Sequence, residues 1–319
     1  MAATLGYALS CEEHAPADLV SYGAMAEEAG FEFVLISDHF HPWLDVQGQA
    51  PFVWSVLAAL SERTERVALG TGVTCPTTRI HPAIVAHAAA TTAVLAPGRF
   101  WLGVGTGENL NEHILGDHWP PTSVRRERLA EAVEVIRALW SGRQVEHYGR
   151  HYTVENARLY TLPDEPPPIL VAASGPKAAE LAGEIGDGLV GLAPDPEVPE
   201  TFAASGGDGP RVAQLHVCWA EDAGEARRTA HEQWSNSGLG GELSQELPTP
   251  AHFEQAAATV REEDVTGPLP CGPELEPYLE SAQKYVDTGW DHLYFHQIGP
   301  DQQGFIAFAE RELLPALRS

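Results

Sequence analysis

Closely spaced cysteines are missing from this sequence. Only four cysteines occur in 319 residues, and no Cys-x-x-Cys motif is present; the four are Cys11, Cys75, Cys218 and Cys271. This spacing argues against a zinc site or a redox pair. Reduced, mostly buried thiols are expected instead, and no metal is expected.

Positive charge and long apolar runs are also scarce. The chain has 19 basic and 45 acidic residues, so its formal net charge is −26. Nucleic acid and anionic membrane surfaces bind proteins through a positive face, so neither is expected as a partner. No run of 18 apolar residues could span a membrane, and the first residues lack the pattern of a signal peptide. We therefore expect a cytoplasmic protein.

Strand-like and helix-like segments alternate along the whole chain. Eight short apolar segments are typical of buried parallel strands: Leu5–Ser10, Phe33–Ser37, Val67–Val73, Phe100–Val104, Pro168–Ala173, Gly188–Leu192, Val212–Trp219 and His292–His296. Segments with helical spacing lie between and after them: Ala17–Ala29, Phe52–Glu62, Pro82–Leu95, Val124–Trp140, Ala178–Ile185, Ala223–Trp234, Leu275–Val286 and Phe305–Leu317. Such alternation requires parallel strands with helical crossovers.

The alternation alone fits a doubly wound open sheet as well as a closed barrel. The count of eight strands, together with polar residues after several of them, favours a single-domain α/β protein with the (β/α)8 TIM barrel fold. Two irregular insertions, at about residues 105–122 and 235–271, would lie over the C-terminal face of the strands, where they can cover a pocket. Residues Glu146–Tyr160 indicate a surface hairpin around Gly149.

Polar residues follow the second and fourth strands. Asp38 and His39 come directly after Phe33–Ser37, and a histidine there can exchange a proton near neutral pH. The alternative is a buried aspartate beside a surface histidine. After the fourth strand, Gly103-x-Gly105-x-Gly107-Glu108 allows close approach of a flat ligand, with Glu108 facing the pocket; the alternative is a glycine turn with an exposed glutamate. The motif is not the Gly-x-Gly-x-x-Gly fingerprint of dinucleotide-binding folds.

Two further strand ends are candidates for ligand contacts. Ser174-Gly175-Pro176-Lys177 opens a predicted helix, whose free N–H groups could bind a phosphate, or Ser174 could simply cap the helix. Gly70 and Gly72 close the third strand and indicate either a bulge against a ligand or a bend. The positions of His14, His252 and His296 in the sequence do not indicate whether they are structural or functional.

Taken together, these segments resemble a known family. The motifs Ser37-Asp38-His39-Phe40-His41-Pro42-Trp43, Gly103-Val104-Gly105-Thr106-Gly107-Glu108, Leu139-Trp140-Ser141-Gly142 and Ala172-Ala173-Ser174-Gly175-Pro176 resemble the luciferase-like (β/α)8 superfamily of flavin and deazaflavin enzymes. Within it, the sequence is most similar to the coenzyme F420-dependent glucose-6-phosphate dehydrogenase group. The resemblance runs nearly end to end.

The resemblance implies a cofactor, a reaction and a set of site residues. The cofactor would be coenzyme F420, bound by Asp38, Gly72, Val73, Cys75, Thr106, Gly107 and Asn111 and, on its phosphate side, by Ser174, Gly175, Lys177 and Ala178. The Gly72–Val73 bulge often holds a cis peptide bond in that family. The catalytic residues would be His39 as base, Glu108 in proton exchange with the cofactor, and Trp43 shaping the pocket. Substrate contacts would come from Glu12, Trp43, Leu192 and Asp195.

The sequence departs from that group where a substrate phosphate would bind. Asp195 stands at or near the place of one family lysine, and from Ser235 to Glu310 the only lysine or arginine residues are Arg261 and Lys284. We therefore expect an F420-dependent dehydrogenase or reductase of a neutral alcohol, ketone or sugar rather than of glucose 6-phosphate. An FMN-dependent luciferase-like monooxygenase and a non-catalytic F420-binding barrel are the alternatives. The resemblance implies a homodimer, which no residue demonstrates.

Overall fold

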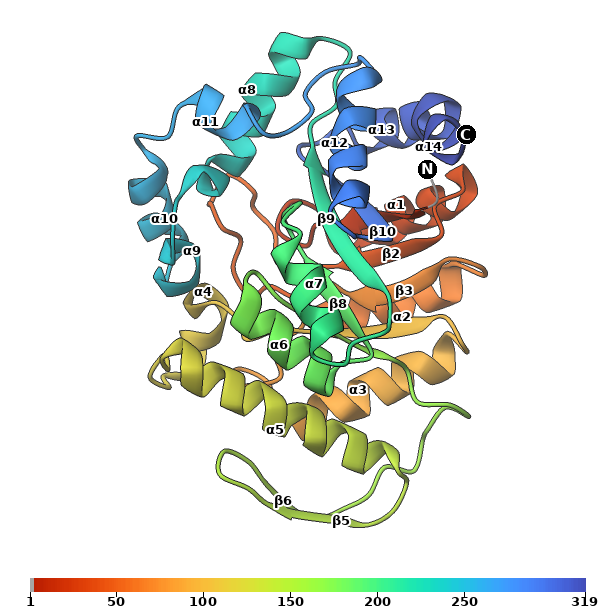
Figure 1. The fold of residues 1–319 in the computed structure, drawn as a ribbon, viewed down its shortest axis with the longest axis vertical. Coiled ribbons are helices and arrows are strands. Elements are labelled where there is room, and N and C mark those ends of the chain that lie inside the picture. The colour runs from red at the N-terminus through yellow and green to blue at the C-terminus, as the bar shows by residue number, and fades with distance from the viewer. Residues whose placement is uncertain (1–2) are drawn as a thin grey trace.

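The computed structural model describes residues 3–319, in which eight parallel strands close into a barrel (Figure 1). Neighbouring strands follow the order β1-β10-β9-β8-β7-β4-β3-β2. Their bounds are β1 Thr4–Leu9, β2 Phe33–Ile36, β3 Ala68–Thr71, β4 Phe100–Val104, β7 Ile169–Ala172, β8 Gly188–Gly191, β9 Arg211–Val217 and β10 His292–Gln297. This closed order confirms the predicted TIM barrel and excludes the open sheet.

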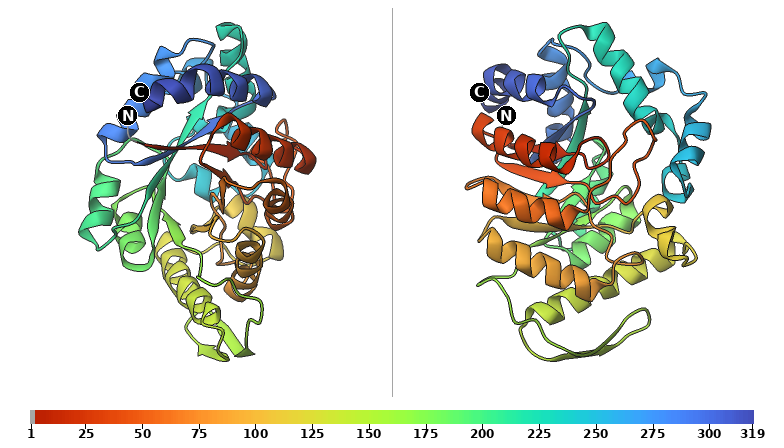
Figure 2. Two further views of the ribbon diagram at one scale, coloured as in Figure 1. Left: turned by 90° about the vertical axis from the view of Figure 1, so that its right-hand side faces the viewer. Right: turned by 180° about the vertical axis from the view of Figure 1, so that it is seen from behind.

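Helices surround the barrel, as Figures 1 and 2 show. They are α1 Pro16–Ala29, α2 Val53–Arg63, α3 Pro82–Leu95, α5 Thr122–Trp140, α6 Pro176–Ile185, α7 Glu197–Ala204, α8 Ala223–Trp234, α12 Glu276–Asp287, α13 Gln302–Phe308 and α14 Leu314–Arg318. The expected helices are confirmed to within a few residues. The short α7 was not predicted, and the last predicted helix is divided by a π-helical turn at Ala309–Leu313.

The two insertions contain short helices, so the expectation of irregular chain was wrong there. The first holds α4 Asn109–Glu112, and the second holds α9 Leu243–Glu246, α10 Pro250–Ala257 and α11 Glu262–Thr266. Local caps stabilise two of these helices: the Thr249 hydroxyl accepts a hydrogen bond from the His252 amide, and the Asp264 carboxylate accepts one from the Arg261 amide at 3.0 Å. Helices this short show too little periodicity to be predicted. Figure 1 shows α4, α9 and α10 on the same side of the molecule.

The predicted hairpin is confirmed as β5 Val145–Tyr148 and β6 Thr153–Ala157, which pair antiparallel outside α5 (Figure 1). None of the helices in residues 3–319 is long and apolar enough to cross a membrane. All four cysteine thiols are free, and Cys11, Cys75 and Cys218 are buried.

Alternating residues of each strand face the inside of the barrel. A compact interior cluster contains Phe33 and Leu35 of β2, Val212 of β9 and Tyr294 of β10. Residues two apart on a strand share a face, so His216 and His296 also face inward, at the C-terminal end of β9 and β10. That end of the barrel therefore carries polar side chains above an apolar floor.

Candidate functional site

Glu12 and His39 form a buried acid–histidine pair beyond the ends of β1 and β2. The Nε2 atom of His39 lies 3.2 Å from Oε1 of Glu12, and both side chains are at least nine-tenths buried. The other carboxylate oxygen of Glu12 accepts hydrogen bonds from the hydroxyls of Ser10 and Ser37. Burial alone would raise the pKa of Glu12, but His39 and the Ser37 hydroxyl outweigh it, so the pKa is lowered.

The surroundings of His39 determine where its hydrogens lie. Its Nδ1 atom is 3.0 Å from the carbonyl oxygen of His41, and a carbonyl only accepts hydrogen bonds, so Nδ1 carries a hydrogen. The contact between Nε2 and Glu12 then requires a proton between the two groups. When this proton is present, the pair can donate it as a general acid. When it is absent, Nε2 of His39 can accept a proton as a general base. The pair can therefore serve proton transfer in either direction.

Trp43 lies beside this pair. Its ring centroid is 4.9 Å from that of His39, and the ring of Phe253 from α10 packs edge-on against it at 5.1 Å. Gln47 fixes the local backbone by accepting a hydrogen bond from the Trp43 amide at 2.8 Å. The second insertion thus packs against one wall of the acid–histidine site.

A buried guanidinium joins two carboxylates, one of which belongs to Asp38, the residue before His39. Arg79 Nη2 lies 2.9 Å from Oδ1 of Asp38, and Arg79 Nε lies 3.4 Å from Oε1 of Glu112. The other Asp38 oxygen accepts a hydrogen bond from the Thr74 hydroxyl at 2.7 Å. Burial raises the pKa of Glu112 to about 7, because it outweighs the attraction of Arg79. The Asp38 carboxylate is therefore fully engaged within the protein.

Asn111 links the first insertion to the segment that carries His39. Its side-chain oxygen accepts hydrogen bonds from the amides of Phe40 at 2.9 Å and His41 at 3.1 Å. Its Nδ2 atom is buried and has no hydrogen-bond partner in residues 3–319. A buried unpaired donor is costly, so this atom is a candidate for contact with a bound group.

We expect Asn111→Leu to lower the free energy of unfolding by about 1–3 kcal/mol, since it leaves two amides without their acceptor. Urea unfolding would measure this loss. Asn111→Asp keeps the acceptor and should recover most of it. Asn109→Leu removes only a hydrogen bond from Nδ2 to the Glu246 carbonyl near the surface, so it is the matched control. Equal losses in Asn109→Leu and Asn111→Leu would contradict this role of Asn111.

Glycines bring the backbone close together beneath this cluster. Gly107 has a φ of +76°, and a Cβ atom there would lie 2.5 Å from Sγ of Cys75. The Gly72–Val73 peptide bond is cis, as the family resemblance led us to expect. The Cys75 thiol is buried against the Thr77 hydroxyl at 3.0 Å. These residues therefore form a tight wall at the ends of β3 and β4.

Thr106 and Glu108 lie in the segment that connects β4 to α4, and both are half-buried. The backbone carbonyl of Glu108 accepts hydrogen bonds from the amides of Asn111 and Glu112. Its carboxylate has no hydrogen bond to the described residues, unlike that of Glu112. The acid role of Glu108 stays a prediction.

The remaining predicted residues lie after β7 and β8. Ser174 and Lys177 are exposed, Gly175 and Ala178 are half-buried, and α6 begins at Pro176. Gly175 occupies the N-cap position and no side chain caps the helix, so the alternative of capping by Ser174 was wrong. Leu192 and Asp195 are exposed in the loop before α7, where Asp195 accepts a hydrogen bond from the Glu197 amide at 3.0 Å. Their roles stay predictions.

Several residues near this site had no assigned role in the sequence. Arg79 follows the third strand by a few residues, and no motif pointed to it. Arg125 of α5 is almost completely buried, packs 4.4 Å from the Trp119 ring and hydrogen bonds to Gln245 at 2.8 Å, which joins the two insertions. His296, for which the sequence spacing indicates no role, is buried, and its Nε2 atom lies 2.8 Å from Oε2 of Glu13. In the sequence, only its position at the end of a predicted strand could have pointed to His296.

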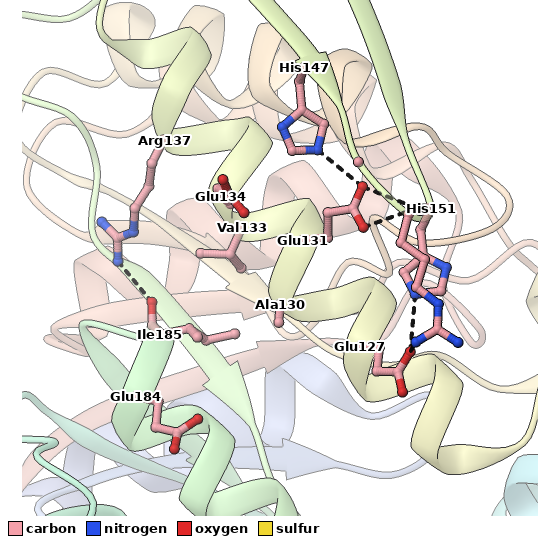
Figure 3. A pocket seen from close by; sticks show the side chains of 12 residues that line it. Glu127, Ala130, Glu131, Val133, Glu134, Arg137, His147, His151, Glu184 and Ile185 are labelled. Atoms are coloured by element: carbon pink, nitrogen blue, oxygen red, sulfur yellow. Dashed lines mark hydrogen bonds and ion pairs between the residues drawn. The ribbon is translucent and has the colours of Figure 1, made fainter.

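A groove with many polar residues lies on the outside of the barrel, along α5 and bordered by the hairpin and the end of α6 (Figure 3). There Glu131 accepts hydrogen bonds from Nε2 of His147 at 3.0 Å and from the Tyr152 amide at 2.8 Å. These contacts fasten the hairpin to α5. The groove is formed by the outer face of α5, away from Glu12 and His39, so it is not the candidate active site.

Known proteins match this chain over nearly its whole length. A model of the family described as luciferase-like monooxygenase matches residues 3–292. The F420-dependent glucose-6-phosphate dehydrogenase of Beutenbergia cavernae is 38% identical over 328 residues, covering 99% of this chain and 97% of that protein. The enzyme with the same name from Microbacterium testaceum is 36% identical, covering 98% and 97%.

Solved structures are similar over the whole chain. An F420-dependent secondary alcohol dehydrogenase in complex with an F420–acetone adduct has a TM-score of 0.92 and 30% identity, with 100% of both chains covered. The coenzyme F420-dependent tetrahydromethanopterin reductase of Methanopyrus kandleri has a TM-score of 0.80 at 20% identity, covering 99% of this chain and 100% of that one, which is a likeness of fold alone.

Proposed function

This chain belongs to the luciferase-like monooxygenase family, and within that family we propose that it is a coenzyme F420-dependent oxidoreductase of a neutral alcohol or ketone. The observation that carries the proposal is the buried Glu12–His39 pair beside Trp43 at the mouth of the barrel. Oxidation of an alcohol must remove the hydroxyl proton as well as a hydride, and this pair can take that proton. Relatives at 38% and 30% identity, matched over nearly the whole chain, are described as F420-dependent enzymes, and this supports the proposal.

Residues of the barrel mouth fit the cofactor. The unpaired Nδ2 atom of Asn111 offers a donor, and the glycines after β3 and β4 let the backbone approach a flat ring. We propose that Thr106, Gly107, Val73 and Asn111 contact the ring side, while Lys177 and the free amides at the start of α6 contact the phosphate. When bound, F420 supplies the hydride acceptor or donor.

Residues of the protein accept or donate the proton of the substrate hydroxyl. In the oxidative direction, His39 without the shared proton accepts the substrate hydroxyl proton at Nε2, and the Glu12 carboxylate stabilises the imidazolium that results. In the reductive direction, the protonated pair donates to the carbonyl oxygen. The hydroxyls of Ser10 and Ser37 donate to one oxygen of Glu12 and so hold its carboxylate in place. Trp43 excludes water from one side of the pair.

The charges near the mouth support a neutral substrate. Arg261 is exposed and paired with Asp264, Lys284 is exposed on α12, and Arg125 is paired with Glu246 at 3.2 Å. Asp195 in the exposed loop would repel a phosphate. Each missing charge-assisted hydrogen bond is worth about 1.5–3 kcal/mol, so we propose that glucose 6-phosphate is a poor substrate.

Oxidised F420 mixed with the protein and a panel of secondary alcohols tests this function. We expect the deazaflavin absorbance to bleach with at least one neutral alcohol and to change little with glucose 6-phosphate. Tight FMN binding with NADH-driven oxygen uptake would favour the monooxygenase instead. F420 binding without turnover of any alcohol or ketone would indicate a non-catalytic barrel. The homodimer, the cytoplasmic location and the single-domain organisation with two covering insertions stay predictions.

A further inference from the structure

A second polar group faces the inside of the barrel mouth, beside the acid–histidine pair. His216 of β9 and His296 of β10 are register partners, and both lie two residues beyond inward-facing positions on their strands. Their Nδ1 atoms are 2.8 Å apart. The Nε2 atom of His296 is 2.8 Å from Oε2 of Glu13, whose other oxygen accepts a hydrogen bond from the Gly299 amide at 2.8 Å.

This chain of groups ends at one ring nitrogen of His216. His296 and the Glu13 side chain are only 2% and 3% exposed, whereas His216 is half-buried. Burial and the neighbouring His296 lower the pKa of His216 to about 3, so its ring is neutral. The Nε2 atom of His216 has no hydrogen-bond partner in the described part of the chain. The buried Glu13–His296 pair therefore orients a free ring nitrogen at the more open end of the group.

The free nitrogen can either accept or donate a hydrogen bond. If His296 keeps a hydrogen only on Nε2, His216 donates through Nδ1 and its Nε2 is an acceptor. If His296 is doubly protonated against the Glu13 carboxylate, His216 accepts at Nδ1 and its Nε2 carries a hydrogen. A hydroxyl group both donates and accepts, so it suits either state.

This group adjoins the proposed reaction site. Glu12 and Glu13 are consecutive, so their Cα atoms are about 3.8 Å apart; Glu12 contacts His39 and Glu13 contacts His296. The ring of Trp234 packs against His296 at 4.6 Å and against His216 at 5.8 Å. Trp43 packs against the same apolar cluster as Trp234. The two histidine groups therefore share one apolar wall.

We propose that His216 is a specificity-determining residue that binds a second hydroxyl group of the substrate, so that the preferred substrates are neutral diols or polyols. The inference rests on the proposed function, in which the first hydroxyl contacts His39. An anionic group is disfavoured at this position because Glu12 and Glu13 both lie nearby. A wall of indole rings with two polar positions matches a small carbon chain that carries two hydroxyls.

Three alcohols test the inference: butan-2-ol, and two diols, butane-2,3-diol and butane-1,3-diol, that each add one hydroxyl to it at a different position. With the full-length enzyme and F420, we expect kcat/KM for the better diol to exceed that for butan-2-ol about tenfold, the effect of one hydrogen bond of about 1.4 kcal/mol. His216→Phe should lower this ratio at least fivefold. His292→Phe changes the inward histidine at the other end of β10 and should keep the wild-type ratio.

A binding measurement keeps the test independent of folding of the variant. In histidine ring 1H–15N spectra of the unmutated protein, butane-2,3-diol should shift the signals of one neutral imidazole, and butan-2-ol should shift them much less. Oxidation of butan-2-ol with no diol preference and no such shift would overturn this inference and leave the proposed function intact. Failure to bind F420, with no turnover of any of the three alcohols, would overturn both.

Discussion

Replacing His39 with alanine is expected to lower turnover by about 10²–10⁴-fold while F420 still binds. That is the usual contribution of a positioned acid or base. In this protein Nε2 of His39 is the atom that shares a proton with Glu12. The substitution removes this atom and leaves Asn111 and the tight wall at the ends of β3 and β4 unchanged. Steady-state F420 reduction would measure the turnover, and fluorescence titration would measure the Kd for F420.

The matched control is His87→Ala, because His87 is an exposed histidine on α3. It should keep both turnover and affinity. Glu12→Gln should fall between the two, since the histidine remains but loses its carboxylate. Turnover in His39→Ala within a few-fold of the unmutated enzyme would exclude His39 as the proton acceptor and leave Glu108 as the principal candidate.

Replacing Arg79 with glutamine is expected to lower the free energy of unfolding by about 3–5 kcal/mol, the usual cost of breaking a buried ion pair by removing one partner. The variant would leave Asp38 and Glu112 buried without their shared cation. Arg79 also donates to the backbone carbonyl of Asp38 at 3.1 Å, so the segment leading to His39 should lose its position. Urea unfolding and the Kd for F420 would report the two effects.

The loss should depend on pH. Burial already raises the pKa of Glu112 to about 7, so the folded protein binds more protons than the unfolded chain between about pH 4.5 and 7, and the stability from this group falls as pH rises. Removing Arg79 widens that window, so the deficit should be larger at pH 8 than at pH 5. Arg79→Lys should restore part of the stability.

Arg66→Gln is the control for the Arg79 variant, since Arg66 is mostly exposed and lies 3.9 Å from Glu27. Exposed pairs contribute about 0–1 kcal/mol, so little change is expected. A deficit in Arg79→Gln as small as that of Arg66→Gln, or one that is the same at both pH values, would refute the structural role assigned to Arg79.

The strands and helices of the barrel could be predicted because their signals are local. Buried strands appear as short apolar runs such as Phe33–Ile36, and helices such as Pro82–Leu95 begin at proline and end near Pro97-Gly98. The short helices of the insertions could not be predicted, because a helix of four to eight residues is held by caps and tertiary contacts more than by its own periodicity.

The candidate site was predicted in part. Position after a strand pointed to Asp38, His39 and Glu108, and the structure brings His39 against Glu12 and Asp38 against Arg79. No local pattern pointed to Arg79 as the partner of both Asp38 and Glu112. His216 lies 80 residues before His296, so their contact depends on β9 and β10 being neighbours.

By itself, the sequence determined the class of this protein: an acidic, cysteine-poor α/β chain with eight strand segments, whose strand ends carry a histidine and carboxylates. These properties follow from composition and from periods of two and 3.6 residues, which each segment expresses alone. The tertiary structure decided which polar groups share protons. Closing the barrel places Glu12 with His39, Arg79 between two carboxylates, and His216 with His296. Hydrogen bonds and ion pairs depend on distances of about 3 Å, and only the closed fold sets those distances.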